Sequence, residues 1–255
     1  MSTTRSAEQV AHRSVGTGPP ELVLVHGWAG TGNYFEETIA ELDLDHVQAT
    51  TFDLNGDGGW SLDAIDDQIL SVVDAIGAQR SILLGYSMGG KFVQHFALRH
   101  PNRIGGLLLV AGTQASSMTL PQELLDDWYG RAGSVDAMKE LVRGFLTGPV
   151  EEEALDRWAQ NAANIPSAAL RGSLQTTLES DFAVEVNTLD VPTLVIAGKR
   201  DEFFTPELLR ATIATQIRGA RMAVVDCGHE IPLERPRELA ALIEAFLAGL
   251  GNSRP

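Results

Sequence analysis

Cysteine and basic residues are scarce in this 255-residue sequence, and each shortage excludes a class of protein. Cys227 is the only cysteine, so the chain has neither an internal disulfide framework nor a cysteine-based metal cluster, as expected in a reducing compartment. The 19 Lys and Arg residues are outnumbered by 34 Asp and Glu residues, which gives a formal net charge of −15. Such a surface repels phosphate backbones and anionic membranes, so we expect neither nucleic acid nor a membrane as partner.

Long apolar segments are also missing. The longest, around residues 104–110, is far too short to span a bilayer. The first eight residues contain no apolar stretch of the kind found in secretion signals, so we expect a soluble protein of the cytoplasm. The length and the 44% hydrophobic composition favour one large α/β domain that carries an insertion.

Strand-like and helix-like patterns alternate along the first 113 residues. Apolar β-prone runs predict strands at residues 22–25, 47–53, 81–86 and 104–111, with helical patterns between them. Ser61 is a suitable N-cap for the helix that follows it. This alternation predicts a mostly parallel sheet with helices on both faces.

The pattern changes between residues 114 and 186. No β-rich run occurs there, and short helices are expected at residues 121–129, 134–145, 151–161 and 167–178. Strand patterns return at residues 192–198 and 221–225, and a final helix carries an apolar stripe. We therefore predict a core domain made of residues 1–113 and 187–255, and a helical lid or cap, residues 114–186, inserted between two strands.

A glycine-rich turn joins the strand at residues 81–86 to the helix after it. Residues 85–90 read Gly-Tyr-Ser-Met-Gly-Gly, and a G-x-S-x-G turn at a strand-to-helix junction holds its serine in a sharp, strained bend with the hydroxyl exposed. Gly85 and Gly89 remove two Cβ atoms that the strand and helix would otherwise press together. The context predicts that Ser87 is a nucleophile, and the alternative is a glycine-rich connection without chemistry.

Two later loops offer the base and the acid that a serine nucleophile needs. Asp201 follows one late strand and His229 follows the next, so both lie at the sheet edge where sites assemble in α/β proteins. The order Ser87, Asp201, His229 is that of the α/β-hydrolase triad. The adjacent Glu202 is the alternative acid, and Asp201 alternatively serves only as a turn or N-cap residue.

Five short motifs together resemble the α/β-hydrolase fold superfamily over nearly the whole chain. They are His26-Gly27-Trp28, residues 85–89, residues 198–201 (Gly-Lys-Arg-Asp), Gly228-His229 and Glu234-Arg235-Pro236. The resemblance implies an α/β-hydrolase fold, a mostly parallel sheet flanked by helices with a helical lid between strands. One stretch departs from the family: residues 53–58 read Asp-Leu-Asn-Gly-Asp-Gly, where members often have D-x-P-G-H-G, so the shape of that loop stays open.

The same resemblance assigns roles to individual residues. It implies that Ser87 is the nucleophile, that His229 is the general base and then the acid, and that Asp201 fixes the histidine tautomer. The backbone N–H groups of Trp28 and Met88 would form the oxyanion hole. No cofactor and no metal are implied.

Candidate substrate-binding residues lie beside the elbow and in the predicted lid. They are Tyr86, Lys91, Trp128, Tyr129 and Trp158. Large apolar or amphipathic side chains are typical of ligand clefts, although packing of the lid helices would produce the same pattern. The acidic lid disfavours a multiply anionic substrate. The leading hypothesis is a serine esterase that cleaves a neutral, moderately hydrophobic ester, lactone or thioester through an acyl-enzyme.

Two other functions remain open at this stage. Residues 85–91 are similar to the G-Y-S-[LM]-G-G-[RK] stretch of the menaquinone-pathway lyase that eliminates pyruvate, and meta-cleavage-product hydrolases share the triad. In that case Lys91 would bind a carboxylate. The third candidate is a triad-bearing small-molecule receptor, as some hormone receptors of this fold are. The sequence predicts neither the natural substrate nor the oligomeric state.

Overall fold

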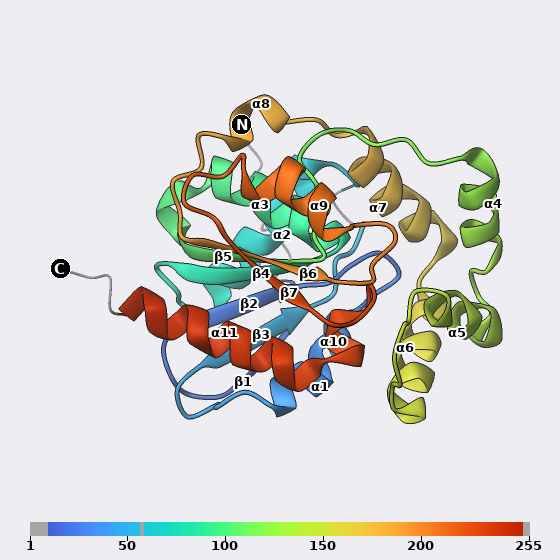
Figure 1. Cartoon of the computed structure of the whole chain (residues 1–255), viewed down its shortest axis with the longest axis horizontal. Coiled ribbons are helices and arrows are strands. Elements are labelled where there is room, and N and C mark those ends of the chain that lie inside the picture. The colour runs from blue at the N-terminus through green and yellow to red at the C-terminus, as the bar shows by residue number, and fades with distance from the viewer. Residues whose placement is uncertain (1–9, 57–58, 252–255) are drawn as a thin grey trace, which may run out of the picture.

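The computed structural model describes residues 10–56 and 59–251, which fold around one seven-stranded sheet (Figure 1). The strands are β1 (His12–Val15), β2 (Glu21–Val25), β3 (Gln48–Phe52), β4 (Ser81–Tyr86), β5 (Ile104–Val110), β6 (Thr193–Gly198) and β7 (Arg221–Val225). Their order across the sheet is β1-β3-β2-β4-β5-β6-β7. β1 pairs antiparallel with β3, and the other neighbours pair in parallel. This is the mostly parallel sheet that the alternating pattern predicts.

Helices cover both faces of the sheet. α2 (Leu62–Ala75) and α3 (Met88–Arg99) pack together on one face, and α1 (Glu36–Ala40) and α11 (Pro236–Gly251) pack together on the other (Figure 1). Successive residues of a strand point to opposite faces. In β4, accordingly, Leu83 joins the apolar cluster under α2 and α3, while Leu84 joins the cluster under α11. A continuous apolar run is therefore what a central parallel strand requires.

The expected N-cap of α2 is present. Ser61 has extended backbone angles, and its Oγ accepts a hydrogen bond from the Ala64 N–H at 3.2 Å. That bond satisfies one of the N–H groups that the first turn of a helix leaves unpaired.

A helical segment lies between β5 and β6, as predicted. It contains α4 (Gln122–Gly130), α5 (Val135–Arg143), α6 (Glu152–Asn164), α7 (Ser167–Glu179) and the short α8 (Ala183–Val186). α4 to α7 stand together at one end of the sheet (Figure 1). Met138, Ala159 and Leu170 are buried in an apolar cluster of this segment.

The two chain connections of this segment run alongside each other. The Phe182 N–H donates to the Ala115 carbonyl at 3.2 Å, and the Met118 N–H donates to the Leu178 carbonyl at 2.8 Å. The segment therefore leaves the sheet and returns to it at one place. Among the described helices, none combines the length and apolarity needed to cross a membrane.

Candidate active site

Ser87 occupies a strained turn between β4 and α3. Its φ of 50° and ψ of −117° lie in a region that residues other than glycine rarely adopt. The Ser87 N–H donates to the Val110 carbonyl at 2.9 Å, and the Ser87 carbonyl accepts from the N–H groups of Gly90 and Thr113, both at 2.9 Å. These bonds to neighbouring elements hold the turn in its unusual conformation.

The glycines on either side of Ser87 are required by close backbone contacts. A Cβ atom on Gly85 would lie 2.4 Å from the Gly89 carbonyl oxygen, and one on Gly89 would lie 2.3 Å from the Val25 carbonyl oxygen. Both distances are far below van der Waals contact. This agrees with the steric reason that the sequence suggested for the two glycines.

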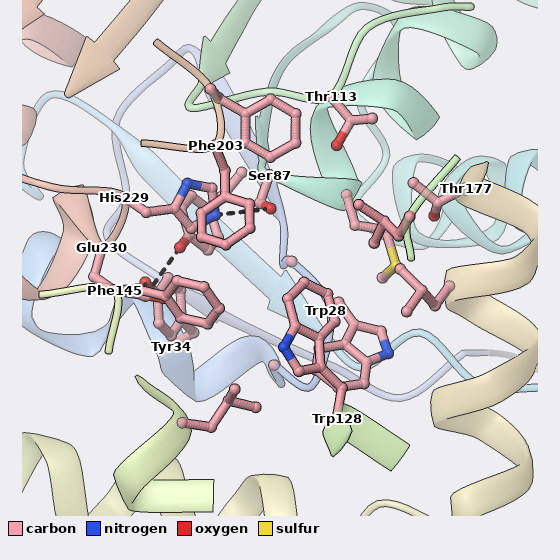
Figure 2. A pocket seen from close by; sticks show the side chains of 18 of the residues that line it. Trp28, Tyr34, Ser87, Thr113, Trp128, Phe145, Thr177, Phe203, His229 and Glu230 are labelled. Atoms are coloured by element: carbon pink, nitrogen blue, oxygen red, sulfur yellow. Dashed lines mark hydrogen bonds between the residues drawn. The ribbon is translucent and has the colours of Figure 1, made fainter. Parts of the chain in front are cut away.

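The three residues predicted as a triad lie in hydrogen-bonding contact. His229 Nε2 is 3.0 Å from Ser87 Oγ, and His229 Nδ1 is 2.7 Å from Asp201 Oδ2. Figure 2 shows the contact between the imidazole and the serine hydroxyl. Asp201 follows β6 and His229 follows β7, so the carboxyl ends of neighbouring parallel strands bring them to one edge.

Backbone bonds hold the Asp201 carboxylate in place. Its Oδ1 atom accepts the N–H groups of Phe203 and Phe204, both at 2.9 Å. The neighbouring Glu202 is exposed. The structure therefore puts Asp201, rather than Glu202, against the imidazole.

The contact between His229 and Asp201 shifts the pKa of both side chains. Burial acts to raise the pKa of Asp201, but the hydrogen bond and charge of His229 outweigh it, and the pKa is lowered. Burial acts to lower the pKa of His229, but the hydrogen bond and charge of Asp201, with the charges of Glu230 and Glu234, outweigh it, and the pKa is raised. Asp201 is thus held as a carboxylate, which stabilises a protonated His229.

The backbone N–H groups of Trp28 and Met88 remain available to a ligand. Met88 is the first residue of α3, so its N–H has no acceptor within the helix. In the described part of the chain, neither N–H donates to a protein acceptor. Both residues line the same cavity as Ser87.

His26 braces the loop that carries Trp28. Its Nδ1 atom is 2.8 Å from the Gly27 carbonyl, and its Nε2 atom accepts the Leu54 N–H at 3.0 Å. Burial lowers the pKa of His26, which favours the neutral ring that these two contacts require. The residue supports the loop without reaching the cavity.

A cavity of about 170 Å³ adjoins the serine, and its wall is mostly apolar. Among the lining side chains are Trp28, Met118, Leu120, Trp128, Leu141, Phe145, Trp158, Leu174, Phe203 and Phe204. Trp28 stacks on Trp128 with ring centroids 5.2 Å apart, which joins the core loop to α4 (Figure 2). The predicted substrate-binding residues Tyr86, Trp128 and Trp158 all belong to this wall.

Two predicted substrate-binding residues, Lys91 and Tyr129, are not in the wall. The Lys91 side chain is fully buried, and its Nζ atom donates to the carbonyls of Ser116, Thr177 and Ser180 at 3.0, 2.7 and 2.6 Å. All three ammonium protons are therefore used by the protein, which leaves none for a substrate carboxylate.

Tyr129 contacts a side chain of α7 instead of lining the cavity. The Arg171 guanidinium lies 4.2 Å from the centre of its ring, an arrangement typical of a cation–π contact. Tyr129 therefore helps to join α4 to α7 and does not line the cavity.

Trp60 contacts α7. The Trp60 carbonyl accepts the Thr176 hydroxyl at 2.9 Å, and a Cβ atom on Gly172 would lie 2.2 Å from the Trp60 ring. Asp57 and Gly58, which belong to the stretch that departs from the family pattern, lie outside the described residues. Trp60 thus packs against the helical segment.

The sequence interpretation missed Glu230. This residue lines the cavity beside His229, is only 5% exposed, and accepts the hydroxyl groups of Tyr34 and Tyr86 on Oε2. Burial raises the pKa of its carboxyl group. Its only sequence signal was its position directly after the candidate base.

Known proteins are similar to this chain in sequence and in fold. The family model described as "Alpha/beta hydrolase family" matches residues 22–242. A pimeloyl-[acyl-carrier protein] methyl ester esterase from Stenotrophomonas maltophilia is 30% identical over 248 residues, which cover 91% of this chain and 94% of that protein. A 2-hydroxy-6-oxononadienedioate/2-hydroxy-6-oxononatrienedioate hydrolase from Paraburkholderia xenovorans is 25% identical over 264 residues, with 94% and 91% covered. An esterase structure from Exiguobacterium antarcticum superposes with a TM-score of 0.82 at 19% identity, covering 94% of this chain and 95% of that one.

Proposed function

Because this chain belongs to the alpha/beta hydrolase family and is an esterase-type enzyme, we propose that it cleaves a neutral, moderately hydrophobic carboxylic ester, lactone or thioester. The reaction passes through an acyl-enzyme on Ser87. His229 serves as general base and acid, and Asp201 orients it.

In the first half of the reaction, Ser87 Oγ attacks the substrate carbonyl as His229 Nε2, 3.0 Å away, takes the hydroxyl proton. The oxyanion of the tetrahedral intermediate accepts the N–H groups of Trp28 and Met88. A donor of this kind typically lowers the barrier by about 2.7–4 kcal/mol. His229 then gives its proton to the departing alcohol or thiol, and the acyl group stays on Ser87.

In the second half, water takes the place of the alcohol. His229 removes a proton from the water, the hydroxide attacks the acyl carbonyl, and the protonated His229 returns the proton to Ser87 Oγ. The carboxylic acid product leaves. Throughout the cycle the Asp201 carboxylate accepts a hydrogen bond from His229 Nδ1–H, with 2.7 Å between Nδ1 and Oδ2, and stabilises the charged imidazole.

The observation that carries the choice of substrate is the composition of the cavity wall. Aromatic and aliphatic side chains dominate it, and no Lys or Arg from the described residues lines it. A substrate carboxylate would therefore find no positive partner, which disfavours carbon–carbon bond substrates that bear carboxylates. A neutral acyl chain matches such a wall. The Stenotrophomonas maltophilia relative, named for a methyl ester, supports the same bond type.

We assign the helical segment of residues 114–186 the role of a lid over this cavity. It contributes Trp128 from α4, Trp158 from α6 and Leu174 from α7 to the wall. By excluding water, such a cover strengthens the interactions that develop at the reacting carbonyl. The core domain, residues 1–113 and 187–255, supplies the reacting groups.

A fluorophosphonate probe tests the nucleophile. We expect covalent labelling of the wild-type protein, no labelling of Ser87→Ala, and normal labelling of the control Ser167→Ala, which alters an exposed serine on α7. A panel of p-nitrophenyl esters and lactones then measures turnover. Absence of labelling at Ser87 would refute the acyl-enzyme mechanism. Labelling without turnover of any ester or lactone would favour carbon–carbon bond cleavage or a receptor instead.

A further inference from the structure

Glu230 is a buried acid in the cavity wall that the proposed reaction does not use. Asp201 already accepts the Nδ1 proton of His229, so Glu230 is not needed to orient the base. Among the described residues that line the cavity, Glu230 is the only Asp or Glu, and no basic side chain other than His229 accompanies it.

Two tyrosines hold the Glu230 carboxylate from the same side. Both hydroxyl groups donate to its Oε2 atom, Tyr86 from 2.9 Å and Tyr34 in closer contact, and the two rings stack with centroids 4.7 Å apart. Figure 2 shows Glu230 bonded to Tyr34 and next to His229. Burial and the charge of Glu230 raise the pKa of Tyr34 and of Tyr86, so both stay protonated as donors. Burial raises the pKa of Glu230, and the two hydroxyl donors together with the charge of His229 act against burial in favour of the ionised form.

Burying such a carboxylate in an apolar wall is energetically unfavourable. Removing a carboxylate from water costs several kcal/mol, and an apolar side chain of similar volume is often neutral or stabilising in its place. Titratable groups of this kind cluster at functional sites. Its place beside the reacting groups therefore points to a role in substrate choice.

The effect of Glu230 on a ligand follows from its charge. Two like charges about 7 Å apart repel by about 2 kcal/mol at an effective dielectric constant of about 20, which corresponds to roughly thirtyfold in binding. No Lys or Arg among the described residues of the wall offsets this repulsion.

We propose that Glu230, held by Tyr34 and Tyr86, is a specificity-determining residue that excludes acyl groups bearing a carboxylate of their own. The site is thereby reserved for neutral acyl chains, and dicarboxylic half-esters are rejected. This inference rests on the proposed ester hydrolysis, because it concerns which acyl groups of an ester substrate the site accepts.

A matched set of methyl esters tests the proposal. Dimethyl adipate is neutral, monomethyl adipate carries one carboxylate, and the monoamide of monomethyl adipate is polar but uncharged. Release of methanol gives kcat/KM for each. In the wild type we expect the diester and the amide to be hydrolysed well and the half-acid poorly. In Glu230→Gln, which keeps the shape of the side chain and an acceptor for both tyrosines, we expect the ratio of diester to half-acid kcat/KM to fall by about tenfold or more.

Glu234→Gln is the matched control. Glu234 is equally buried, at 5% exposure, but it accepts the Gly228 and Thr147 N–H groups and does not line the cavity. The ratio in this variant should match that of the wild type.

Three outcomes would overturn the assignment. The first is a ratio in Glu230→Gln within twofold of the wild-type ratio. The second is an equal fall of this ratio in Glu234→Gln, because the half-acid would then be rejected by the overall negative charge of the protein and not by Glu230 in particular. The third is measured on the wild type alone. It is a kcat/KM for the amide as low as that for the half-acid, which would show that the site rejects polar groups in general and not charged ones. If the wild type hydrolyses none of the three esters, ester hydrolysis itself fails and this inference fails with it.

Discussion

Replacing Asp201 with asparagine tests the role of Asp201 in orienting His229 without disturbing the loop that carries Asp201. In Asp201→Asn, the amide oxygen can still accept the Phe203 and Phe204 N–H groups, which lie 2.9 Å from Oδ1 in the native protein. The amide nitrogen then faces His229 Nδ1. Because an NH₂ group only donates, it favours the imidazole tautomer with its proton on Nε2. Ser87 Oγ would then face a protonated Nε2, which has no lone pair to accept the hydroxyl proton.

The expected loss of activity is far larger than the loss of stability. A wrong histidine tautomer in a Ser-His-Asp triad lowers kcat by about 10⁴, which is about 5.5 kcal/mol of barrier. A hydrogen bond to a charged group contributes only about 1.5–3 kcal/mol to folding. We therefore expect Asp201→Asn to stay folded in urea titrations while its turnover of p-nitrophenyl butyrate falls by about four orders of magnitude.

The adjacent glutamate provides the control for this prediction. Glu202 is exposed, whereas Asp201 is 3% exposed and bonded to the imidazole. Glu202→Gln should keep wild-type turnover. A loss of less than tenfold in Asp201→Asn, or an equal loss in Glu202→Gln, would refute the assignment of Asp201.

Two further predictions concern pH and the buried lysine. As pH falls, kcat/KM for a neutral ester should drop with a midpoint above 6.5, because His229 must be unprotonated to accept the serine proton and its pKa is raised. Burial lowers this pKa, but Asp201 and the charges of Glu230 and Glu234 together outweigh burial. A midpoint below 6.5 in a pH–rate profile would contradict this. Lys91→Met should lower the free energy of unfolding in urea by about 1–3 kcal/mol, because three carbonyls lose their donor and the bond to the Thr177 carbonyl is buried. Lys199→Met, at an exposed site, is the control, and an unchanged unfolding midpoint in Lys91→Met would show that the three bonds add no stability.

The sheet could be predicted from sequence because its central strands are covered on both faces. β2 and β4 read as uninterrupted apolar runs, and the structure confirms both. Short helices left no such signal. α8 and α9 (Pro206–Leu209) have four residues each, about one turn, which is too short to display helical periodicity.

The structure brings the predicted site residues together where strand ends determine their position, and does not do so for Lys91, whose position depends on one face of a helix. Ser87, Asp201 and His229 follow parallel strands, so the topology brings them to one edge. Lys91 lies on α3, which is packed on several sides, and a motif does not reveal that its ammonium meets the lid connections. Glu230 was missed because its partners Tyr86 and Tyr34 are 144 and 196 residues away in sequence.

The paired connections at residues 115–118 and 178–182 make the helical segment replaceable as a unit. Its first and last residues are joined by the bonds from Phe182 to Ala115 and from Met118 to Leu178, and Lys91 binds carbonyls from both sides. Insertions or exchanges between these two points leave the register of β5 and β6 unchanged. The segment also supports the reacting groups, because Trp28 Nε1 donates to the Leu170 carbonyl at 2.8 Å and the His229 N–H donates to the Phe145 carbonyl at 3.3 Å. A replacement of residues 119–177 therefore has to keep these contacts as well as the two connections.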